Sequence, residues 1–397
     1  MRVLTKTSEL ANFCQQARQH PFVTVDTEFI RERTYFAKLC LVQLAFTGED
    51  NNNAALVDPL SDVLSLEPFY ELLSDESVVK VFHAARQDIE IFFSEAQIIP
   101  KPLFDTQIAA MVCGYGDQVG YETLVRDIAK FDLNKSSRIS DWSQRPLTNS
   151  QKCYAIADVT HLRVIYEHLK AETEARARAH WLEGELELLL STDTYRIEPR
   201  EIWKRIKSRN RSPRFLAILR ELAAFRELYA QQNNIPRSWV LRDEVLVLLA
   251  NRQPKTANEI RKTRLFSTKI GHAKLFAGVL EAISKGQALS ESELPKSNDK
   301  SSIVNTNTAA SDLLKVLLKT RSKEFGVAAK LIASSAEIEA LAAGARSLPV
   351  LSGWRREIYG KDALRLCEGK LALSVRQNLD EVEVVDRETM LLRDASL

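Results

Sequence analysis

The sequence predicts an α/β domain with a mixed sheet, followed by two small domains built only of helices. Strand and helix signals alternate over the first part of the chain, and strand signals stop after about residue 172. A polar segment rich in Ser, Asn and Thr then divides the helical half in two. With 397 residues, the chain is long enough for two or three domains of about 100–200 residues each.

Four strands are expected in the α/β domain. β-branched and apolar runs at 22–30, 38–46 and 54–59 predict three strands in succession, and a run at 78–84 predicts a fourth. A helix with Ser8 as its N-cap precedes them. Three successive strands followed by alternating helix and strand signals indicate a mixed sheet. Further helices are expected at 86–95, 105–113, 121–130 and 148–171.

The rest of the chain is expected to hold no strand. Residues 173–207 predict a charged helical connector, and apolar residues recur at helical spacing over 208–288. A polar linker at 289–307 leads to a second helical segment at 308–378. Residues 379–397 are acidic, and we expect them to form a loosely held tail.

Composition excludes several classes of protein. Hydrophobic residues make up 45% of the chain and charged residues 27%, as in globular proteins. No run approaches the roughly 18 apolar residues of a membrane span, and the first residues lack the apolar stretch of a secretory signal. The five cysteines are scattered and never spaced as CxxC, which excludes a disulfide framework. We therefore expect a cytoplasmic protein that does not associate with membranes.

The net charge of +2 conceals an uneven distribution. Residues 1–180 hold 19 Lys and Arg against 25 Asp and Glu, whereas residues 200–285 hold 19 against 7, a net charge of +12. Such a basic segment indicates a polyanionic partner, although cations can also simply solvate a helical face. The candidates for contact with nucleic acid stand close together and are Lys204, Arg205, Lys207, Arg209 and Arg211.

A pair of carboxylates lies on the first predicted strand. Asp26 and Glu28 stand at i and i+2, so they project from one face of an otherwise apolar strand. Burying two unpaired carboxylates is costly, and a hard divalent cation such as magnesium or manganese would remove that penalty. The alternative is an exposed pair at a strand end, bridged to Arg31 or Arg33.

Two further acidic motifs are ambiguous when taken alone. Asp88 falls in the first turn of a predicted helix, where acidic residues often only complement the helix dipole. Tyr154 and Asp158 stand at i and i+4 and share a helical face, where they could form a simple hydrogen-bonded pair.

Taken in order, these motifs resemble those of the DEDD superfamily of 3′–5′ exonucleases. Cys153 stands where one form of the superfamily has His, so the form with Tyr matches better. The segments VDTEFIRERTYFAKLCLVQLA, GYGDQVGYETLV and SDWSQRPLTNSQKCYAIADVTHL are similar to those of the ribonuclease D family. This resemblance covers about residues 1–170 and implies a ribonuclease H-like fold for residues 1–172. In the same family, residues 208–288 resemble a helicase-and-RNase-D C-terminal (HRDC) domain, and residues 308–378 resemble a second, divergent copy.

The resemblance implies removal of nucleotides from the 3′ end of RNA, with tRNA precursors as substrate. It also implies two divalent metal ions, Mg²⁺ or Mn²⁺, about 3.5–4 Å apart. Asp26 would bridge them, Glu28 and Asp158 would complete one site, and Asp88 would support the other. Tyr154 would orient the attacking water, because a phenol with a usual pKa near 10 is a poor base near neutral pH.

The residues leave two other functions open. One is a 3′–5′ DNA exonuclease of the same superfamily, because the choice of RNA rests on contacts to the 2′-hydroxyl rather than on the acidic residues. The other is a non-catalytic adaptor that binds nucleic acid. We expect a monomer with no obligatory protein partner.

Several other side chains are weaker candidates for contact with the substrate. Phe29 could stack on a terminal base, although a Phe on a strand is more often part of the core. Gln43 and His83 lie near the motifs, and each could instead be a satisfied internal polar group.

Three residues near the third motif are expected to be structural. We expect Cys153 to be a small buried side chain. Trp142 and Arg145 are expected to serve mainly in packing and in a surface contact.

Overall fold

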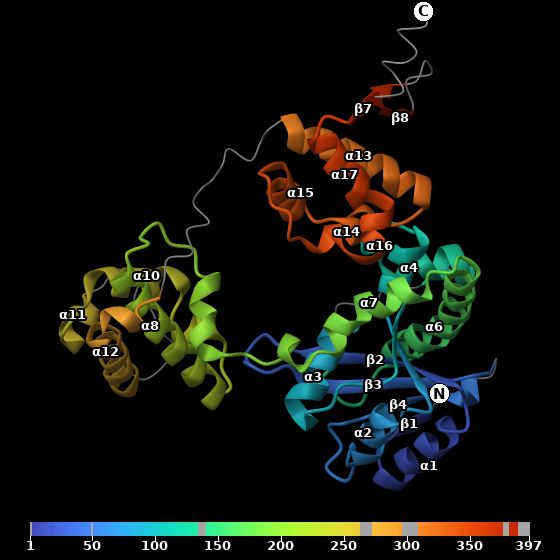
Figure 1. Ribbon diagram of the computed structural model, residues 1–397. Helices are drawn as coiled ribbons and strands as arrows, with labels where there is room; N and C mark the ends of the chain where they lie inside the picture. The colour runs from blue at the N-terminus through green and yellow to red at the C-terminus, as the bar shows by residue number, and fades with distance from the viewer. Residues whose placement is uncertain are drawn as a thin grey trace, which may run out of the picture.

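The structure is a computed structural model, and it describes residues 2–48, 51–133, 140–262, 272–295, 309–375 and 381–387. Within these ranges the chain forms one α/β domain and two helical domains (Figure 1). No helix in them combines the length and the apolar content that crossing a bilayer requires. Most of the predicted linker, at 296–307, and the tail after residue 387 lie outside the described residues.

Six strands form the sheet of the α/β domain, in the order β1-β4-β3-β2-β5-β6. The pairs β2/β3 and β3/β4 are antiparallel, and the pairs β1/β4, β2/β5 and β5/β6 are parallel. The prediction of a mixed sheet is therefore confirmed. The strands are β1 (Arg2–Leu4), β2 (Phe22–Ile30), β3 (Lys38–Phe46), β4 (Ala54–Val57), β5 (Val79–Phe82) and β6 (Leu103–Asp105).

Some of these elements carry no clear sequence signal. The edge strands β1 and β6 have three residues each, too few to show an alternating pattern, and helix α2 (Glu67–Ser74) is likewise absent from the prediction. Helix α1 (Thr7–Ala17) is present, but Ser8 lies inside it, and its N-cap residue, Lys6, makes no side-chain cap. The predicted capping role of Ser8 is therefore wrong.

Helix α6 (Asn149–Ala175) covers one face of the sheet, and α1, α2 and α3 (Arg86–Ala96) cover the other. Apolar side chains of β3 and β4 pack against Ala155, Ile156 and Val159 of α6. The remaining helices of this domain are α4 (Thr106–Cys113) and α5 (Tyr121–Leu124), the latter continued by a wider turn at Val125–Ala129.

The predicted helical connector joins two cores. Its helix α7 (Ala179–Leu190) buries Leu182 and Leu186 in the core of the α/β domain. Further along, the short helix η5 (Pro199–Arg205) leads to Ile206, which is buried in the core of the first helical domain. The connector is therefore packed at both ends.

The two helical domains share one order of elements. The first has helices of 20, 4, 10, 5 and 17 residues: α8 (Pro213–Gln232), α9 (Arg237–Val240), α10 (Asp243–Arg252), α11 (Ala257–Arg261) and α12 (His272–Ala288). The second begins with helices of 17, 4 and 8 residues and then a short turn: α13 (Ala309–Phe325), α14 (Ala329–Ile332), α15 (Ser335–Ala342) and η7 (Pro349–Leu351). A continuous helical run ends it: α16 (Gly353–Arg355), η8 (Arg356–Gly360) and α17 (Lys361–Cys367).

A β-hairpin follows the second helical domain, and it corrects two predictions. Strand β7 (Leu371–Val375) lies within the segment that was expected to be all helical, and β8 (Val382–Asp386) lies within the expected loose tail. The two strands are antiparallel, and Arg365 of α17 forms an ion pair with Asp386. The acidic residues of this segment alternate with valines, so its charge concealed a strand pattern.

The first helical domain contacts the α/β domain at the β2–β3 hairpin. The hydroxyl of Tyr35 donates to Glu227, and the guanidinium of Arg237 lies over the Tyr35 ring, 5.1 Å from its centre. The side-chain oxygen of Asn234 accepts hydrogen bonds from the backbone N–H groups of Tyr35 and Phe36, each at 3.1 Å. Asn234 has a φ of 46° and forms the turn between α8 and α9.

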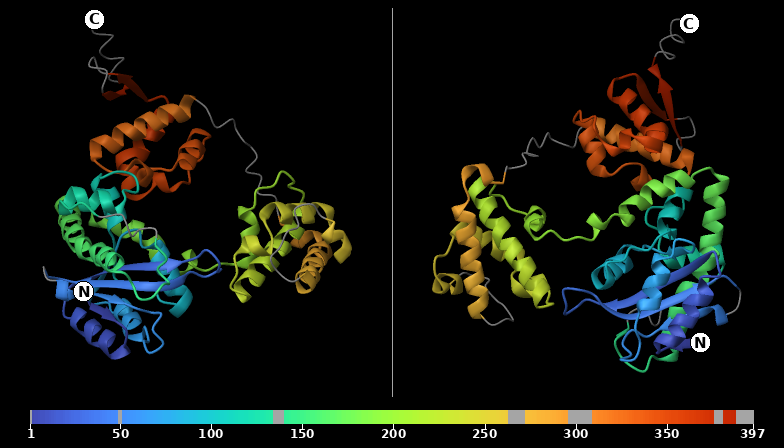
Figure 2. Two further views of the ribbon diagram at one scale, coloured as in Figure 1. Left: turned by 180° about the vertical axis from the view of Figure 1, so that it is seen from behind. Right: turned by 60° about the horizontal axis from the view of Figure 1, so that its bottom comes forward.

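The second helical domain docks on a different part of the α/β domain (Figure 2). Two tryptophans, Trp181 and Trp354, stack across the contact with ring centres 4.5 Å apart. Arg178 lies over Trp181 and donates to the carbonyl of Gly326 at 2.9 Å. Gly326 has a φ of 55° and forms the turn between α13 and α14. Each helical domain therefore uses its first turn to contact the α/β domain.

We expect Trp354→Ala to loosen the second helical domain. Stacked aromatic pairs contribute about 0.5–1.5 kcal/mol beyond their buried area. Arg355 would also lose its contact with the Trp354 ring, although it keeps its ion pair with Glu185. The radius of gyration from small-angle X-ray scattering is expected to rise. Trp354→Phe, which keeps a ring in place, is the control, and equal radii for the two variants would contradict the prediction.

Candidate active site

Strand β2 presents two carboxylates toward the helix α6. Asp26 lies opposite Gln43 in the antiparallel register with β3, and Glu28 lies opposite Leu41. Carboxylate oxygens of Asp26, Glu28 and Asp158 all lie within 4.8 Å of one another. Arg31, one of the two bridging partners expected for an exposed pair, binds Glu90 at 2.5 Å instead. The structure therefore brings together three of the predicted residues in one cluster.

Two hydroxyl groups, one on β2 and one on α5, bind backbone carbonyls of α6. Thr24, on the same face as Asp26, shares its hydroxyl proton between the carbonyls of Ala45 at 2.9 Å and Val159 at 2.8 Å. From the other side, the hydroxyl of Tyr121 donates to the carbonyl of Asp158 at 2.6 Å. These bonds fix the position of the Asp158 backbone beside the carboxylates of β2.

Asp88 lies beside this cluster rather than in it. Its side chain is 7% exposed and accepts a hydrogen bond from the hydroxyl of Thr27, the residue between Asp26 and Glu28. The turn that leads into α3 is held by Asp105, whose carboxylate accepts from the backbone N–H groups of Ala84 at 3.1 Å and Ala85 at 2.8 Å. Asp88 is thereby fixed to both β2 and the adjoining turn.

Burial and mutual repulsion raise the pKa values of the carboxylates. Burial, followed by repulsion from Asp26, Asp158 and Asp88, raises the pKa of Glu28 to about 9. Burial raises the pKa of Asp158 to about 7, although a hydrogen bond from Tyr154 opposes the shift. The pKa values of Asp26 and Asp88 also lie well above their usual range, first through burial and then through repulsion from a neighbouring carboxylate.

This donor set fits a divalent cation. It consists of carboxylate oxygens, which are the ligands that Mg²⁺ and Mn²⁺ prefer. Among the described residues, burial and repulsion between carboxylates, rather than a neighbouring cation, govern the pKa values of this group. A bound cation would relieve the repulsion between these groups.

Tyr154 completes the third motif. It forms a hydrogen bond with Asp158, and its ring centre lies 6.1 Å from that of Trp142. Trp142 is buried, as expected, whereas Cys153 is exposed, so the prediction of a buried cysteine is wrong. Cys153 faces outward because Tyr154 and Asp158 take the inner face of α6.

The weaker candidates near the cluster lie in different surroundings. Phe29 is partly buried and packs against the apolar core. His83 is bonded to the hydroxyl of Thr106 at 3.0 Å, which is the arrangement of an internal polar group. Gln43 is fully buried, and neither of its amide atoms has a hydrogen-bond partner within the described residues.

The basic candidates lie elsewhere, on the connector and just before α8 (Figure 1). Lys204 forms an ion pair with Glu201. The remaining four are exposed, and the described residues provide no ion pair to any of them: Arg205, Lys207, Arg209 and Arg211. Arg226 and Arg237, by contrast, are paired with Asp243 and Glu227, so part of the local basic excess is structural.

Sequence reasoning missed the residues that support the carboxylates. Thr24 and Thr27 belong to the same strand run as Asp26, and their hydroxyls could not be placed without knowing which elements pack there. Tyr121 lies in the segment GYETLV, which resembled the family without suggesting a role. Asp105 stands at the N-cap of a predicted helix, and that position was its only signal.

Comparisons with known proteins agree with this geometry. Residues 1–174 match a family model of 3′–5′ exonucleases, and residues 215–282 match the HRDC domain. A ribonuclease D of Jannaschia sp. is 53% identical over 96% of this chain and 99% of its own length. One from Nitrobacter hamburgensis is 45% identical over 95% of this chain and 98% of its own length. The chain belongs to the ribonuclease D family.

The fold of the family has been solved. The crystal structure of Escherichia coli RNase D, described as an exoribonuclease involved in structured RNA processing, is 30% identical and has a TM-score of 0.77. The match covers 93% of this chain and 98% of that one. As a member of the ribonuclease D family, the protein is a 3′–5′ exoribonuclease of the DEDD superfamily.

We expect Asp158→Asn to stabilise the metal-free protein, and the gain to depend on pH. The pKa of Asp158 is raised in the folded state to about 7 from a usual 3.8, so the wild type loses stability as pH rises between these values. The Asn side chain carries no charge, so the variant does not lose this stability as pH rises. The melting temperatures of the variant and the wild type are compared in EDTA. Their difference is expected to be small at pH 4 and to reach its maximum above pH 7. Each kcal/mol of unfolding free energy corresponds to roughly 2–4 °C.

A matched acidic residue serves as control. Asp127→Asn removes an exposed carboxylate of the same domain that is paired with Arg126, so it relieves no buried charge and is not expected to stabilise the protein. A gain for Asp158→Asn that is constant from pH 4 to pH 8 would contradict the ionisation of a buried carboxylate as its cause.

Proposed function

We propose that this exoribonuclease removes nucleotides from the 3′ ends of RNA, chiefly tRNA precursors, by hydrolysis at two divalent metal ions, Mg²⁺ or Mn²⁺. The supporting observation is the convergence of Asp26, Glu28 and Asp158 from β2 and α6, with Asp88 held alongside by Thr27. Structural ion pairs would place a cationic side chain among such acids. The pKa shifts of Asp26, Glu28 and Asp88 arise instead from burial and from repulsion between carboxylates.

Each residue of the site has a distinct task in this proposal. Asp26, Glu28 and Asp158 would hold one ion, and Asp26 and Asp88 would hold the other. When bound, such ions would supply an acidified water and neutralise charge on the phosphate. The hydroxyl of Tyr154 is fixed by its bond to Asp158 and orients that water through its oxygen. Of the weaker candidates for substrate contact, Gln43 lies opposite Asp26 in the sheet, whereas Phe29 packs against the apolar core and His83 is bonded to Thr106.

In this proposal the basic segment binds the phosphates of the RNA backbone. Arg205, Lys207, Arg209 and Arg211 are exposed and free of ion pairs within the described residues, so they are available to phosphates. Lys204 adds to them when its contact with Glu201 opens. This electrostatic contact is independent of sequence and suits an enzyme that moves along a strand. We propose HRDC domains at 208–288 and within 308–378. The second copy rests on the shared order of its helices, which end at Cys367, before strand β7.

The enzyme is proposed to act as a cytoplasmic monomer. All five cysteines are free, as in a reducing compartment. The alternative of a DNA exonuclease would be recognised by equal rates on matched RNA and DNA strands, because the carboxylates do not contact the 2′-hydroxyl.

We expect Asp26→Asn to abolish nuclease activity and to leave RNA binding intact. Loss even of an outer partner of a metal site costs about 10–100-fold, so loss of a ligand shared by two ions is expected to lower kcat at least 100-fold. Release of mononucleotides from a 3′-extended tRNA measures activity, and a filter-binding assay in EDTA measures affinity. Undiminished release would overturn the proposed site.

We expect neutralisation of Lys207, Arg209 and Arg211 to Gln to weaken RNA binding and to flatten its dependence on salt. For single strands, the slope of log K against log salt falls by about 0.7 for each phosphate that the protein no longer neutralises, which gives up to about 2 for three. The matched control neutralises Lys319, Lys323 and Lys330, which are exposed on the second helical domain. Equal slopes for the two triple variants would contradict the assignment.

A further inference from the structure

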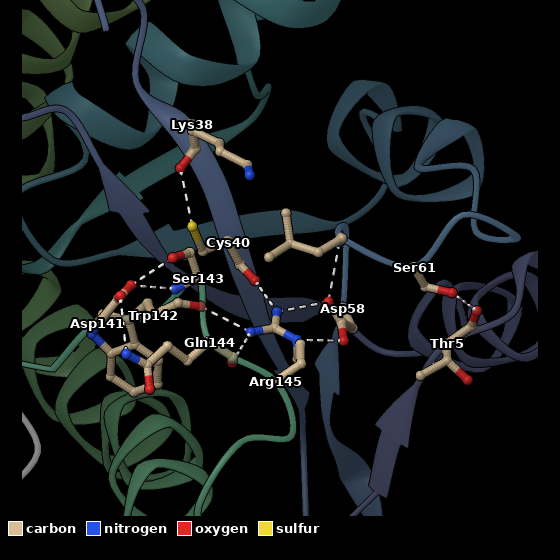
Figure 3. Close-up of polar contacts among 11 residues, drawn as sticks. Thr5, Lys38, Cys40, Asp58, Ser61, Asp141, Trp142, Ser143, Gln144 and Arg145 are labelled. Carbon is tan, nitrogen blue, oxygen red and sulfur yellow. Dashed lines mark hydrogen bonds and ion pairs between the residues drawn. The ribbon is translucent and has the colours of Figure 1, made fainter. Parts of the chain in front are cut away.

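Arg145 uses all of its side-chain N–H groups. Its guanidinium makes a two-pronged contact with the carboxylate of Asp58, with Nε 2.7 Å and Nη2 2.6 Å from the two oxygens. Nη2 also donates to the carbonyl of Cys40 at 2.7 Å, and Nη1 donates to the carbonyls of Trp142 and Gln144, both at 2.8 Å (Figure 3). The expectation of a mere surface contact for Arg145 is therefore wrong.

The acceptors come from three separate parts of the α/β domain. Asp58 follows the end of β4 and also accepts from the backbone N–H of Leu60 at 3.0 Å. Cys40 belongs to β3, which pairs with both β2 and β4. Trp142 and Gln144 belong to the segment that precedes α6. Arg145 thus connects this segment to the start of β3 and the end of β4. Its side chain is 25% exposed.

The tied segment determines where α6 begins. Three residues after Arg145, Thr148 caps α6 and exchanges hydrogen bonds with Gln151 in a capping box. Trp142, at the other end of the segment, is 3% exposed and lies against the ring of Tyr154. Two contacts therefore lead from Arg145 to Tyr154, one along the chain and one through the Trp142 ring.

We propose that the pair of Arg145 and Asp58 is a positioning clamp for the reaction. It sets the place of the first turns of α6, and with them Tyr154, relative to Asp26 and Glu28. Thr24 and Tyr121 fix α6 at residues 157–159 and so hold Asp158 without the clamp. The turns before them are held by the clamp together with the apolar packing of Ala155 and Ile156. Arg145 touches none of the carboxylates of the site, and its effect runs through position alone. This inference rests on the proposed function of the site.

The test compares kcat and KM in Arg145→Lys, Asp58→Asn and the double variant. Lys keeps the charge and loses the planar fork, and Asn keeps the shape and loses the charge. We expect kcat to fall about 10–100-fold in each, since small displacements at an active site cost this much, and KM for RNA to stay within twofold. Because the clamp is one unit, the double variant is expected to lose no more than the worse single variant.

The matched control is Arg18→Lys. Arg18 contacts Glu71 at 3.2 Å and Asp75 at 3.4 Å, at the ends of α1 and α2, which cover the opposite face of the sheet from α6. Its kcat is expected to equal that of the wild type. Rates are compared at temperatures where each variant is fully folded by circular dichroism. Unchanged kcat in the clamp variants, or a loss that merely follows the unfolded fraction, would overturn the clamp.

A further variant decides the matter if neither clamp variant folds. Trp142→Leu leaves Arg145 and Asp58 in place and removes only the ring beside Tyr154, so kcat is expected to fall while KM holds. An unchanged kcat there would overturn the part of the proposal that runs through the Trp142 ring. Asp26→Asn, measured in parallel, distinguishes failure of the proposed active site from failure of the clamp. An active Asp26→Asn variant would contradict the proposed active site. An inactive Asp26→Asn variant together with fully active clamp variants would contradict only the clamp.

Discussion

The repulsion between buried carboxylates is the constraint on which the α/β domain depends. Asp26, Glu28, Asp88 and Asp158 stand close enough to repel one another, and unaided they would separate. Hydroxyl groups hold them together: Thr27 bonds to Asp88, and Thr24 and Tyr121 bind the backbone of α6 rather than its side chains. These ties leave most carboxylate oxygens free to bind a metal, at a cost in stability for the metal-free protein.

The residues of the carboxylate cluster could be picked out of the sequence because each motif is local. Asp26 and Glu28 share a strand face through a spacing of two, and Tyr154 and Asp158 share a helix face through a spacing of four. No local pattern predicts that these residues lie together in one cluster. That prediction rested on the resemblance to a family. The supporting side chains, Thr24 and Asp105 among them, act between elements far apart in the chain, and no spacing rule reports such pairs.

The errors in the fold have equally physical causes. Strands of three residues such as β1 carry too little pattern, and the hairpin of β7 and β8 was hidden by acidic residues on an exposed face. Arg145 was underestimated because an arginine in a polar loop usually contacts solvent. Only its five acceptors, contributed by β3, the end of β4 and its own loop, distinguish it from a surface residue.

The turn between α8 and α9 has a consequence for how the first helical domain can move. Asn234 accepts hydrogen bonds from the backbone of the β2–β3 hairpin, and Tyr35 of that hairpin donates to Glu227 of α8. Ile206, one residue before Lys207, is buried in the core of the same domain. The start of the basic run is therefore attached to the domain that the hairpin holds. A motion of this domain about the hairpin would carry Lys207 with it.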